Sequence, residues 1–121
     1  MPTECKQIIN KVSNLEIDSD DLAIYIGKNN KITFELHLDY FGRQTQRTLD
    51  LFTTNDTIHC DLIAGTVSFL KEGKTIKLDS ERNAFQMAEI AHFFDIINKK
   101  TINDSTPEHA YQVLKIAKGE F

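Results

Sequence analysis

The chain has 121 residues, of which 40% are hydrophobic, so it is long enough for one domain with a real core and too short for two ordinary ones. Its 14 basic and 18 acidic residues give a formal charge of −4, which excludes the electrostatic signature of a protein that binds a nucleic-acid phosphate backbone. We expect a single domain over residues 1–121, with neither nucleic acid nor a membrane as a partner.

The N-terminus and the cysteines indicate a soluble protein. MPTECKQII lacks a basic region followed by an apolar run, and no stretch approaches the length that crosses a membrane. Cys5 and Cys60 lack the close-pair spacing of zinc ligands, and a chain with a good core needs no disulfide. We predict two reduced thiols, no metal site and a cytoplasmic location.

Residues 1–21 fit two interpretations. KQIINKV fits a short strand, whereas a helical stripe is formed by Cys5, Ile8, Ile9, Val12 and Leu15. We favour a strand near residues 6–13. A cluster of carboxylates follows at Asp18, Asp20 and Asp21; because it lacks the pivot glycine and the distal glutamate of a calcium loop, we interpret it as a solvated turn.

From residue 22 to residue 79 apolar and polar residues alternate between short turns, which predicts an antiparallel meander. A three-residue loop at 28–30, with Asn30 left-handed, would pair Ile24 with Phe34. A two-residue type II′ turn at Gly42 would pair Leu36 with Leu49.

Three further two-residue turns complete the predicted meander. They lie at 55–56, 64–65 and 72–73, and they would pair Leu51 with Cys60, Cys60 with Phe69, and Phe69 with Ile76. All five turns place apolar side chains on one face. A one-residue slip would reverse that face, so the agreement favours this register.

The opposite face of the predicted sheet is polar and carries Thr33, Glu35, His37, Asp39, Thr48, Asp50, His59 and Asp61. Histidine and carboxylate side chains are the types that form metal or acid–base clusters, and this face carries His37, Asp39, His59 and Asp61 among them. Polar residues are expected on the open face of a half-buried sheet in any case, so we interpret this face as one that meets water or a wet interface.

Residues 83–98, NAFQMAEIAHFFDIIN, predict a helix that is apolar on two sides. Asn83 and Gln86 have capping-box spacing at its start. One side, which we expect to face the sheet, carries Met87, Ile90, Ala91, Phe94 and Ile97; the other carries Phe85, Phe93 and Ile96. The second side needs more cover than one short helix supplies, so we expect a homo-oligomer.

A second helix follows a polar loop. Ser105-Thr106-Pro107-Glu108 begins it with a hydroxyl cap and a proline in the first turn, and Gly119 ends it. Its expected buried stripe is Ala110, Val113, Leu114 and Ala117. The predicted fold class is therefore α+β: an antiparallel meander sheet of six to seven strands with two C-terminal helices packed on one face.

The order of these segments resembles a known family. EIAHFFDIINKKTINDSTPEHAYQVLKIA (residues 89–117) is similar to the closing segment of the Gfo/Idh/MocA family, the glucose–fructose oxidoreductase and inositol dehydrogenase-like NAD(P)-dependent oxidoreductases. Glu89 and Phe93 match its Glu and the Phe four residues later. ITFELHLDYFGR, LDLFTTNDTIHCDL and SNLEIDSDDLAIYI resemble the family's strands, with Asp56 where the family usually has Gly.

The resemblance implies a C-terminal domain of an oxidoreductase that acts on a sugar, polyol or nucleotide-sugar alcohol. NAD or NADP would bind an absent nucleotide-binding domain of the same protein, because the glycines here form no glycine-rich strand–turn–helix. The Glu-Lys-Pro motif with the catalytic lysine and the segment with the active-site histidine are also missing. We therefore predict no catalytic and no cofactor-binding residue in this chain.

Arg43 and Arg47 are the candidate substrate contacts. They flank the predicted Gly42 turn, and guanidinium groups bind hydroxyls and phosphates. They match no family motif, and a solvated surface position is the alternative for each. A non-catalytic interaction or dimerisation module is the alternative function, because a sheet with one polar face and two backing helices also suits a generic binding domain.

Overall fold

The computed structural model describes residues 1–78 and 83–120 and divides the chain into two units. The first unit combines Met1–Arg43 with Asn103–Phe121, and the second unit is Gln44–Ile102. The predicted α+β class with antiparallel strands is confirmed. The single sheet of six to seven strands is wrong, because the described strands form one sheet of three and another of four. The single domain over residues 1–121 stays a prediction.

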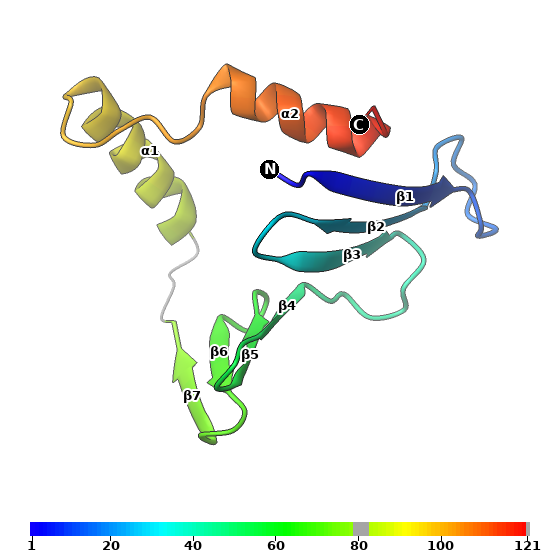
Figure 1. Cartoon of the computed structure of the whole chain (residues 1–121), viewed down its shortest axis with the longest axis horizontal. Helices are drawn as coiled ribbons and strands as arrows, with labels where there is room; N and C mark the ends of the chain where they lie inside the picture. The colour runs from blue at the N-terminus through cyan, green and yellow to red at the C-terminus, as the bar shows by residue number, and fades with distance from the viewer. Residues whose placement is uncertain (79–82, 121) are drawn as a thin grey trace. The chain divides into compact units, whose positions relative to one another are not determined.

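The sheet of the first unit has the order β1-β2-β3 (Figure 1). Its strands are β1 (Glu4–Asn10), β2 (Leu22–Lys28) and β3 (Thr33–Asp39). β1 confirms the strand that we favoured over a helix, although it begins two residues before the expected range. Ile8 of β1 lies opposite Ile24 of β2.

The register of the β2–β3 hairpin differs from the predicted one. Ile24 lies opposite His37, and Phe34 lies opposite Gly27. The offset from the prediction is an odd number of residues, so β2 is turned over relative to β3. Ile24 therefore shares a face with His37, whereas the prediction placed it among apolar partners.

The loop between these strands explains the difference. The side-chain oxygen of Asn29 accepts hydrogen bonds from the backbone N–H groups of Lys31 and Ile32, at 2.8 and 2.9 Å. This Asx turn builds a four-residue loop in place of the predicted three-residue one. The left-handed Asn30 is also wrong, since Lys99 is the one non-glycine residue with positive φ in the described chain.

The first unit buries side chains around β2. Tyr25 is 7% exposed, and the residue two positions on, Gly27, is buried under the ring of Phe34. The C-terminal turn of α2 (Pro107–Lys118) contacts this region. The Tyr25 hydroxyl donates a hydrogen bond to the carbonyl of Ala117 at 3.1 Å. The Gln7 amide, on the same face, donates to the carbonyl of Ile116 at 3.1 Å and accepts from the Gly119 N–H at 3.2 Å.

The ends of α2 confirm the sequence signals. The Thr106 hydroxyl accepts from the N–H of His109 at 3.2 Å, Pro107 is the first helical residue, and Gly119 ends the helix with φ of 75°. The predicted buried stripe is wrong: no residue of α2 is buried, and Val113 and Leu114 are about half exposed. The contact with the sheet is made by backbone carbonyls of the last turn and not by an apolar stripe.

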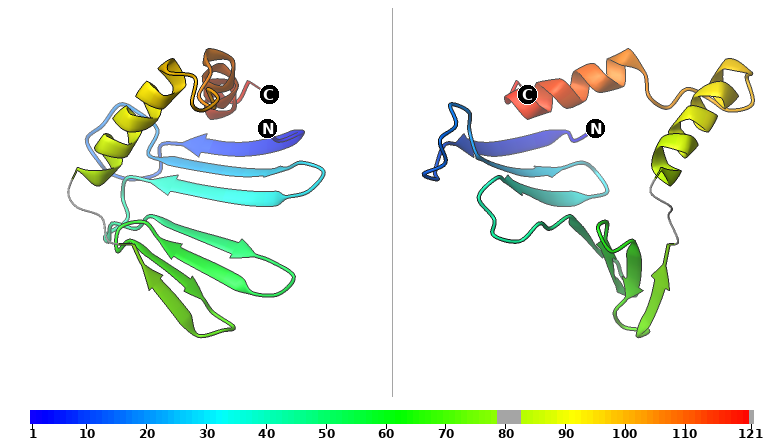
Figure 2. Two further views of the ribbon diagram at one scale, coloured as in Figure 1. Left: turned by 90° about the vertical axis from the view of Figure 1, so that its left-hand side faces the viewer. Right: turned by 180° about the vertical axis from the view of Figure 1, so that it is seen from behind.

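The second unit contains the sheet β4-β5-β6-β7 (Figure 2). Its strands are β4 (Thr48–Phe52), β5 (Thr57–Asp61), β6 (Thr66–Phe69) and β7 (Lys74–Lys77). The predicted pairings are each wrong by two positions, since Cys60 lies opposite Leu49 and Val67. An even offset keeps the faces, so the apolar face is the predicted one and carries Leu49, Leu51, Ile58, Cys60, Val67, Phe69 and Ile76.

The offset of two arises because each hairpin loop has four residues and not two. In the first loop the Thr53 hydroxyl accepts from the N–H of Asp56 at 3.0 Å. In the second, the Asp61 carboxylate accepts from the N–H groups of Ile63 and Ala64, at 2.9 and 2.8 Å. Short polar side chains that bind their own loop N–H groups lengthen the turn beyond the two-residue minimum.

The predicted hairpin between β3 and β4 does not form. Gly42 lacks the positive φ that a type II′ turn requires, and β3 and β4 belong to different sheets and different units. The N–H of Gly42 instead donates to the carboxylate of Asp39 at 2.6 Å. This bond ends β3 and closes the turn that leads out of the first unit.

α1 (Ala84–Ile97) has the predicted extent but not the predicted surroundings. Asn83 makes no side-chain capping bond, so the capping box is wrong. None of its residues is buried, and Met87, Ile90, Ala91 and Phe94, which we expected to face a sheet, are exposed. The two helices belong to different units, α1 to the second and α2 to the first, and the packing of both on one face of a sheet stays a prediction. Neither described helix is long and apolar enough to cross a membrane.

Candidate functional site

The polar face of the second-unit sheet brings Asp50, His59, Ser68 and Thr75 into one line, which we call the polar row. The register places each of these residues directly opposite the next, on β4, β5, β6 and β7. His59 Nδ1 lies 2.6 Å from Asp50 Oδ1, and Ser68 Oγ lies 2.9 Å from Thr75 Oγ1. The row is thus two hydrogen-bonded pairs side by side.

The carboxylate decides which nitrogen of His59 carries the proton. An ionised Asp50 can only accept, so Nδ1 of His59 donates to it, and in the neutral tautomer of the ring Nε2 is the acceptor. Both side chains are partly open to solvent, at 37% and 46% exposure. The row therefore offers an imidazole acceptor and two hydroxyls to a molecule that lies on this face.

Asp61 lies on the same face of β5, two residues after His59. The N–H groups of Ala64 and Ile63 hold the pKa of Asp61 below its usual value, with a smaller effect from His59. This carboxylate is therefore ionised at neutral pH and is occupied by its own loop. In the part of the chain that the structure describes, no three His, Cys, Asp or Glu side chains gather closely enough to hold a metal ion.

The first unit has a second histidine–carboxylate pair at the end of β3. His37 Nε2 lies 2.9 Å from Asp39 Oδ2, and the other carboxylate oxygen accepts from the Gly42 N–H. The Gly42 N–H lowers the pKa of Asp39, and His37 lowers it further. Asp39 is thus an ionised turn residue that also orients His37.

The four residues considered as one cluster are divided between the two units. His37 pairs with Asp39 in the first unit, and His59 pairs with Asp50, not with Asp61, in the second. Asp50 is the partner that the sequence reasoning missed. It stands nine residues before His59, and only the correct four-residue loop between β4 and β5 places it opposite.

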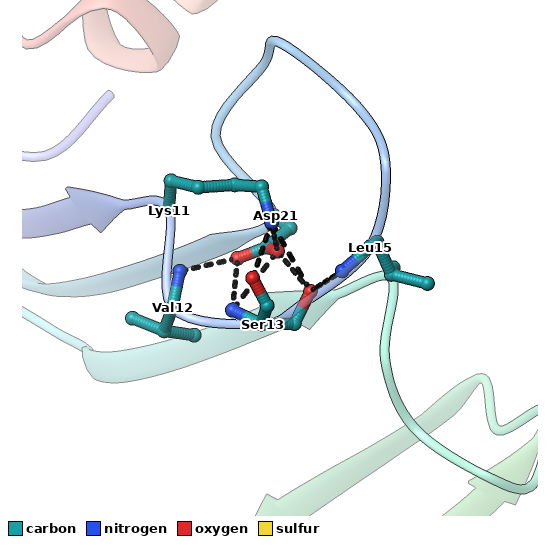
Figure 3. Close-up of polar contacts among 5 residues, drawn as sticks. All are labelled: Lys11, Val12, Ser13, Leu15 and Asp21. Carbon is teal, nitrogen blue, oxygen red and sulfur yellow. Dashed lines mark hydrogen bonds and ion pairs between the residues drawn. The ribbon is translucent and has the colours of Figure 1, made fainter.

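Asp21 is the most buried side chain in the described chain, at 2% exposure, and it lies between the β1–β2 loop and β2 (Figure 3). Its carboxylate accepts from the N–H of Val12 at 2.8 Å, from the N–H of Ser13 at 3.1 Å and from Lys11 Nζ at 2.9 Å. The Ser13 hydroxyl donates to it as well. The predicted solvated turn is wrong at this residue.

The electrostatics of Asp21 follow from these contacts. Burial alone would raise the pKa of Asp21 and is the largest single effect, but the hydrogen bonds from Ser13, Val12 and Lys11 together outweigh it. They hold the pKa well below the usual range of an aspartate. Both oxygens of Asp21 accept from the β1–β2 loop, so this carboxylate closes the loop.

Arg43 and Arg47 are exposed and lie on the segment between β3 and β4. Arg43 is the last residue of the first unit, and Arg47 precedes β4 in the second, where its carbonyl accepts from the N–H of Leu62 at 2.9 Å. The type II′ turn that they are expected to flank does not form, because Gly42 lacks a positive φ. Their role as substrate contacts stays a prediction.

Comparison with known proteins gave no relative: no family model matches the chain, and no curated protein or solved structure is significantly similar to it. The polar row and the exposed apolar side of α1 are therefore the features from which a function is argued.

Proposed function

We propose that this chain acts by association with other protein surface, as the C-terminal, substrate-side and oligomerisation domain of an NAD(P)-dependent oxidoreductase for a sugar, polyol or nucleotide-sugar alcohol. It is inactive alone. Three features support the proposal: the exposed apolar side of α1, the polar row, and the resemblance of the segment order to the Gfo/Idh/MocA family.

The observation that carries the proposal is the exposure of α1. A helix that is apolar on two sides is normally buried, yet Phe85 is 71% exposed and Met87 is 63% exposed. Exposed apolar patches of this kind mark surfaces that meet protein. A domain that needs a neighbour to cover its helix fits a part of a larger assembly better than a protein that works alone.

The polar row supports the substrate-side role. In the neutral ring the imidazole Nε2 accepts, the hydroxyls donate and accept, and the register of the strands holds them on one face of the sheet. Polyhydroxylated substrates need such donors and acceptors from the protein. In the intact enzyme the row would form part of one wall of the substrate site, and the nucleotide and catalytic residues would come from the absent domain.

A non-catalytic interaction or dimerisation module is the second candidate. The exposure of α1 favours it equally, because that surface requires a partner and not a reaction. The two candidates differ in what accompanies the chain. The first requires a glycine-rich nucleotide-binding segment upstream of it or in a partner, and the second requires none.

Both candidates are tested on the product of the whole gene. We expect its coding sequence to continue into a glycine-rich nucleotide-binding segment and its product to reduce NAD(P) with a panel of polyols and sugars. We expect His59→Ala to raise the KM for the substrate several-fold, with His109→Ala, a change of an exposed histidine on α2, as the matched control. A whole product without such a segment and without activity would favour the second candidate.

A further inference from the structure

We propose that Phe52 is a stacking platform for a neutral sugar or cyclitol ring whose hydroxyls bind the polar row. The inference deepens the proposed function, on which it rests, by adding a specificity-determining residue. It also selects one substrate class: a neutral ring in place of an open-chain polyol or a nucleotide sugar.

The register places Phe52 on the same face of the sheet as the polar row. Phe52 is the last residue of β4, two positions after Asp50, and it lies opposite Thr57, whereas Leu51 faces the apolar side. Diagonal neighbours on paired strands are about 7–8 Å apart, so a ligand that contacts His59 can also reach the ring of Phe52. All of these residues belong to one hydrogen-bonded sheet, so their relative positions do not depend on any other part of the chain.

The ring of Phe52 is open within its own sheet. Phe52 is 83% exposed, so the side chains of β4–β7 do not cover it. The other residues that these four strands place on this face are all polar. One flat aromatic ring beside a carboxylate, an imidazole and hydroxyls suits a ligand that has an apolar face and a polar rim.

A sugar or cyclitol ring is a ligand of this kind. Its C–H groups form an apolar patch on one face of the ring, and its hydroxyls project from the rim. Stacking on Phe52 removes both this patch and the aromatic ring from water. An open-chain polyol has no continuous apolar face and loses more rotational freedom when it binds, so Phe52 adds little to its affinity.

The polar row has room for a ligand hydroxyl beside His59. The ladder between β5 and β6 makes His59 and Ser68 a hydrogen-bonded pair, whose Cα atoms are about 5.5 Å apart. The pairs on either side, Asp50–His59 and Ser68–Thr75, are of the non-hydrogen-bonded kind, at about 4.5 Å, and their side chains bond to each other. The wider step falls between the two bonded pairs, where a ligand hydroxyl can donate to Nε2 of the neutral His59 ring.

The charges of the polar face favour a neutral ligand. Asp50 lies opposite His59, and Asp61 follows His59 on the same face of β5, held ionised by its own loop. Lys77 lies on this face as well, opposite Thr66 in the neighbouring row. Two carboxylates close to the imidazole repel the pyrophosphate of a nucleotide sugar, whereas neutral hydroxyls can donate to them.

Nuclear magnetic resonance titration of the whole chain tests the proposal. Glucose and myo-inositol are the neutral rings, and sorbitol is the open-chain polyol with the same number of carbon atoms. We expect both rings at millimolar concentrations to shift the aromatic signals of Phe52 and the imidazole signals of His59 in a saturable way. The affinity for sorbitol should be lower by about fivefold or more.

Substitutions of Phe52 separate stacking from general apolar contact. Phe52→Leu keeps an apolar side chain but removes the flat ring, so it should lower the affinity for both rings about fivefold and leave that for sorbitol unchanged. Phe52→Tyr keeps the ring and should keep the affinity. Phe85→Leu is the matched control, because it makes the same exchange at an exposed phenylalanine of α1, outside the sheet. Circular dichroism of each variant shows whether the fold is retained.

Several outcomes would overturn the inference. They are the absence of saturable shifts with either ring, equal affinity for rings and sorbitol, and equal effects of Phe52→Leu and Phe85→Leu. Tighter binding of UDP-glucose than of glucose would overturn the selection of a neutral ligand. None of these results depends on a nucleotide-binding segment or on activity. A whole gene product that lacks such a segment would refute the proposed function and leave the measured binding of rings in place.

Discussion

The hydrogen bond between Tyr25 and α2 gives the sharpest stability prediction for the first unit. Tyr25→Phe removes the hydroxyl that donates to the Ala117 carbonyl at 3.1 Å and leaves the ring, which is 7% exposed, in place. A hydrogen bond of this kind contributes about 0.5–1.5 kcal/mol. In a unit of about 60 residues, 1 kcal/mol corresponds to roughly 4–8 °C in Tm.

Thermal unfolding followed by circular dichroism measures this change. Tyr40→Phe is the matched control, because Tyr40 is 73% exposed and the same hydroxyl is lost to solvent. We expect Tyr25→Phe to lower the Tm of the first unit by several degrees and Tyr40→Phe to leave it within about one degree. Equal Tm values for the two variants would refute the docking of α2 through Tyr25.

Three further variants test the contacts that set the loops and helix ends. Gly119→Ala should destabilise the first unit by about 1–2 kcal/mol, since φ of 75° strains any side chain and the added Cβ would overlap the Gln7 amide; urea unfolding measures it. Asp56→Ala should destabilise the second unit by about 1–3 kcal/mol, because its carboxylate accepts from the N–H of Lys71 at 2.7 Å and so joins two hairpin loops; an unchanged urea midpoint would contradict this. Because the folded pKa of Asp21 lies below its unfolded value near 4, its contribution to stability is present above about pH 4 and is lost as pH falls further; Asp21→Asn should reduce the loss measured between pH 5 and pH 2.

The helices and the apolar face of the β4–β7 sheet could be predicted from the sequence, because each depends on residues that are close together in the chain. α1 begins and ends as its apolar period indicates, and α2 begins at the Thr106 cap and ends at Gly119. The apolar face of the β4–β7 sheet also follows from alternation alone. The predicted register of each hairpin is wrong by two residues, but the predicted apolar face is still correct, because an even shift in register does not exchange the two faces of a strand.

The hairpin loops could not be predicted because side chains compete with the backbone for their N–H groups. Asn29, Thr53 and Asp61 each bind N–H groups of the following loop and lengthen the turn to four residues. At Asn29 this shift is odd and turns β2 over. The partner of His59 was missed for the same reason, since Asp50 faces it only in the four-residue register.

Asp21 and Tyr25 were missed because their partners come from outside any periodic pattern. Asp21 binds residues of the preceding loop, and Tyr25 reaches a carbonyl near the end of the chain, 92 residues away. Neither contact leaves a spacing that a sequence reading detects. The resemblance to the oxidoreductase family rests on the order of segments. Segment order does not predict the contacts of Asp21 or Tyr25 either.

Calorimetric titration of NAD and NADP into the isolated chain tests the central claim, that this chain is a domain without its own cofactor site. Its glycines, at positions 27, 42, 65, 73 and 119, form no glycine-rich strand–turn–helix that could cradle a pyrophosphate. The account predicts no saturable heat for either nucleotide. Micromolar affinity for NAD or NADP would contradict it and would require a nucleotide site within these residues.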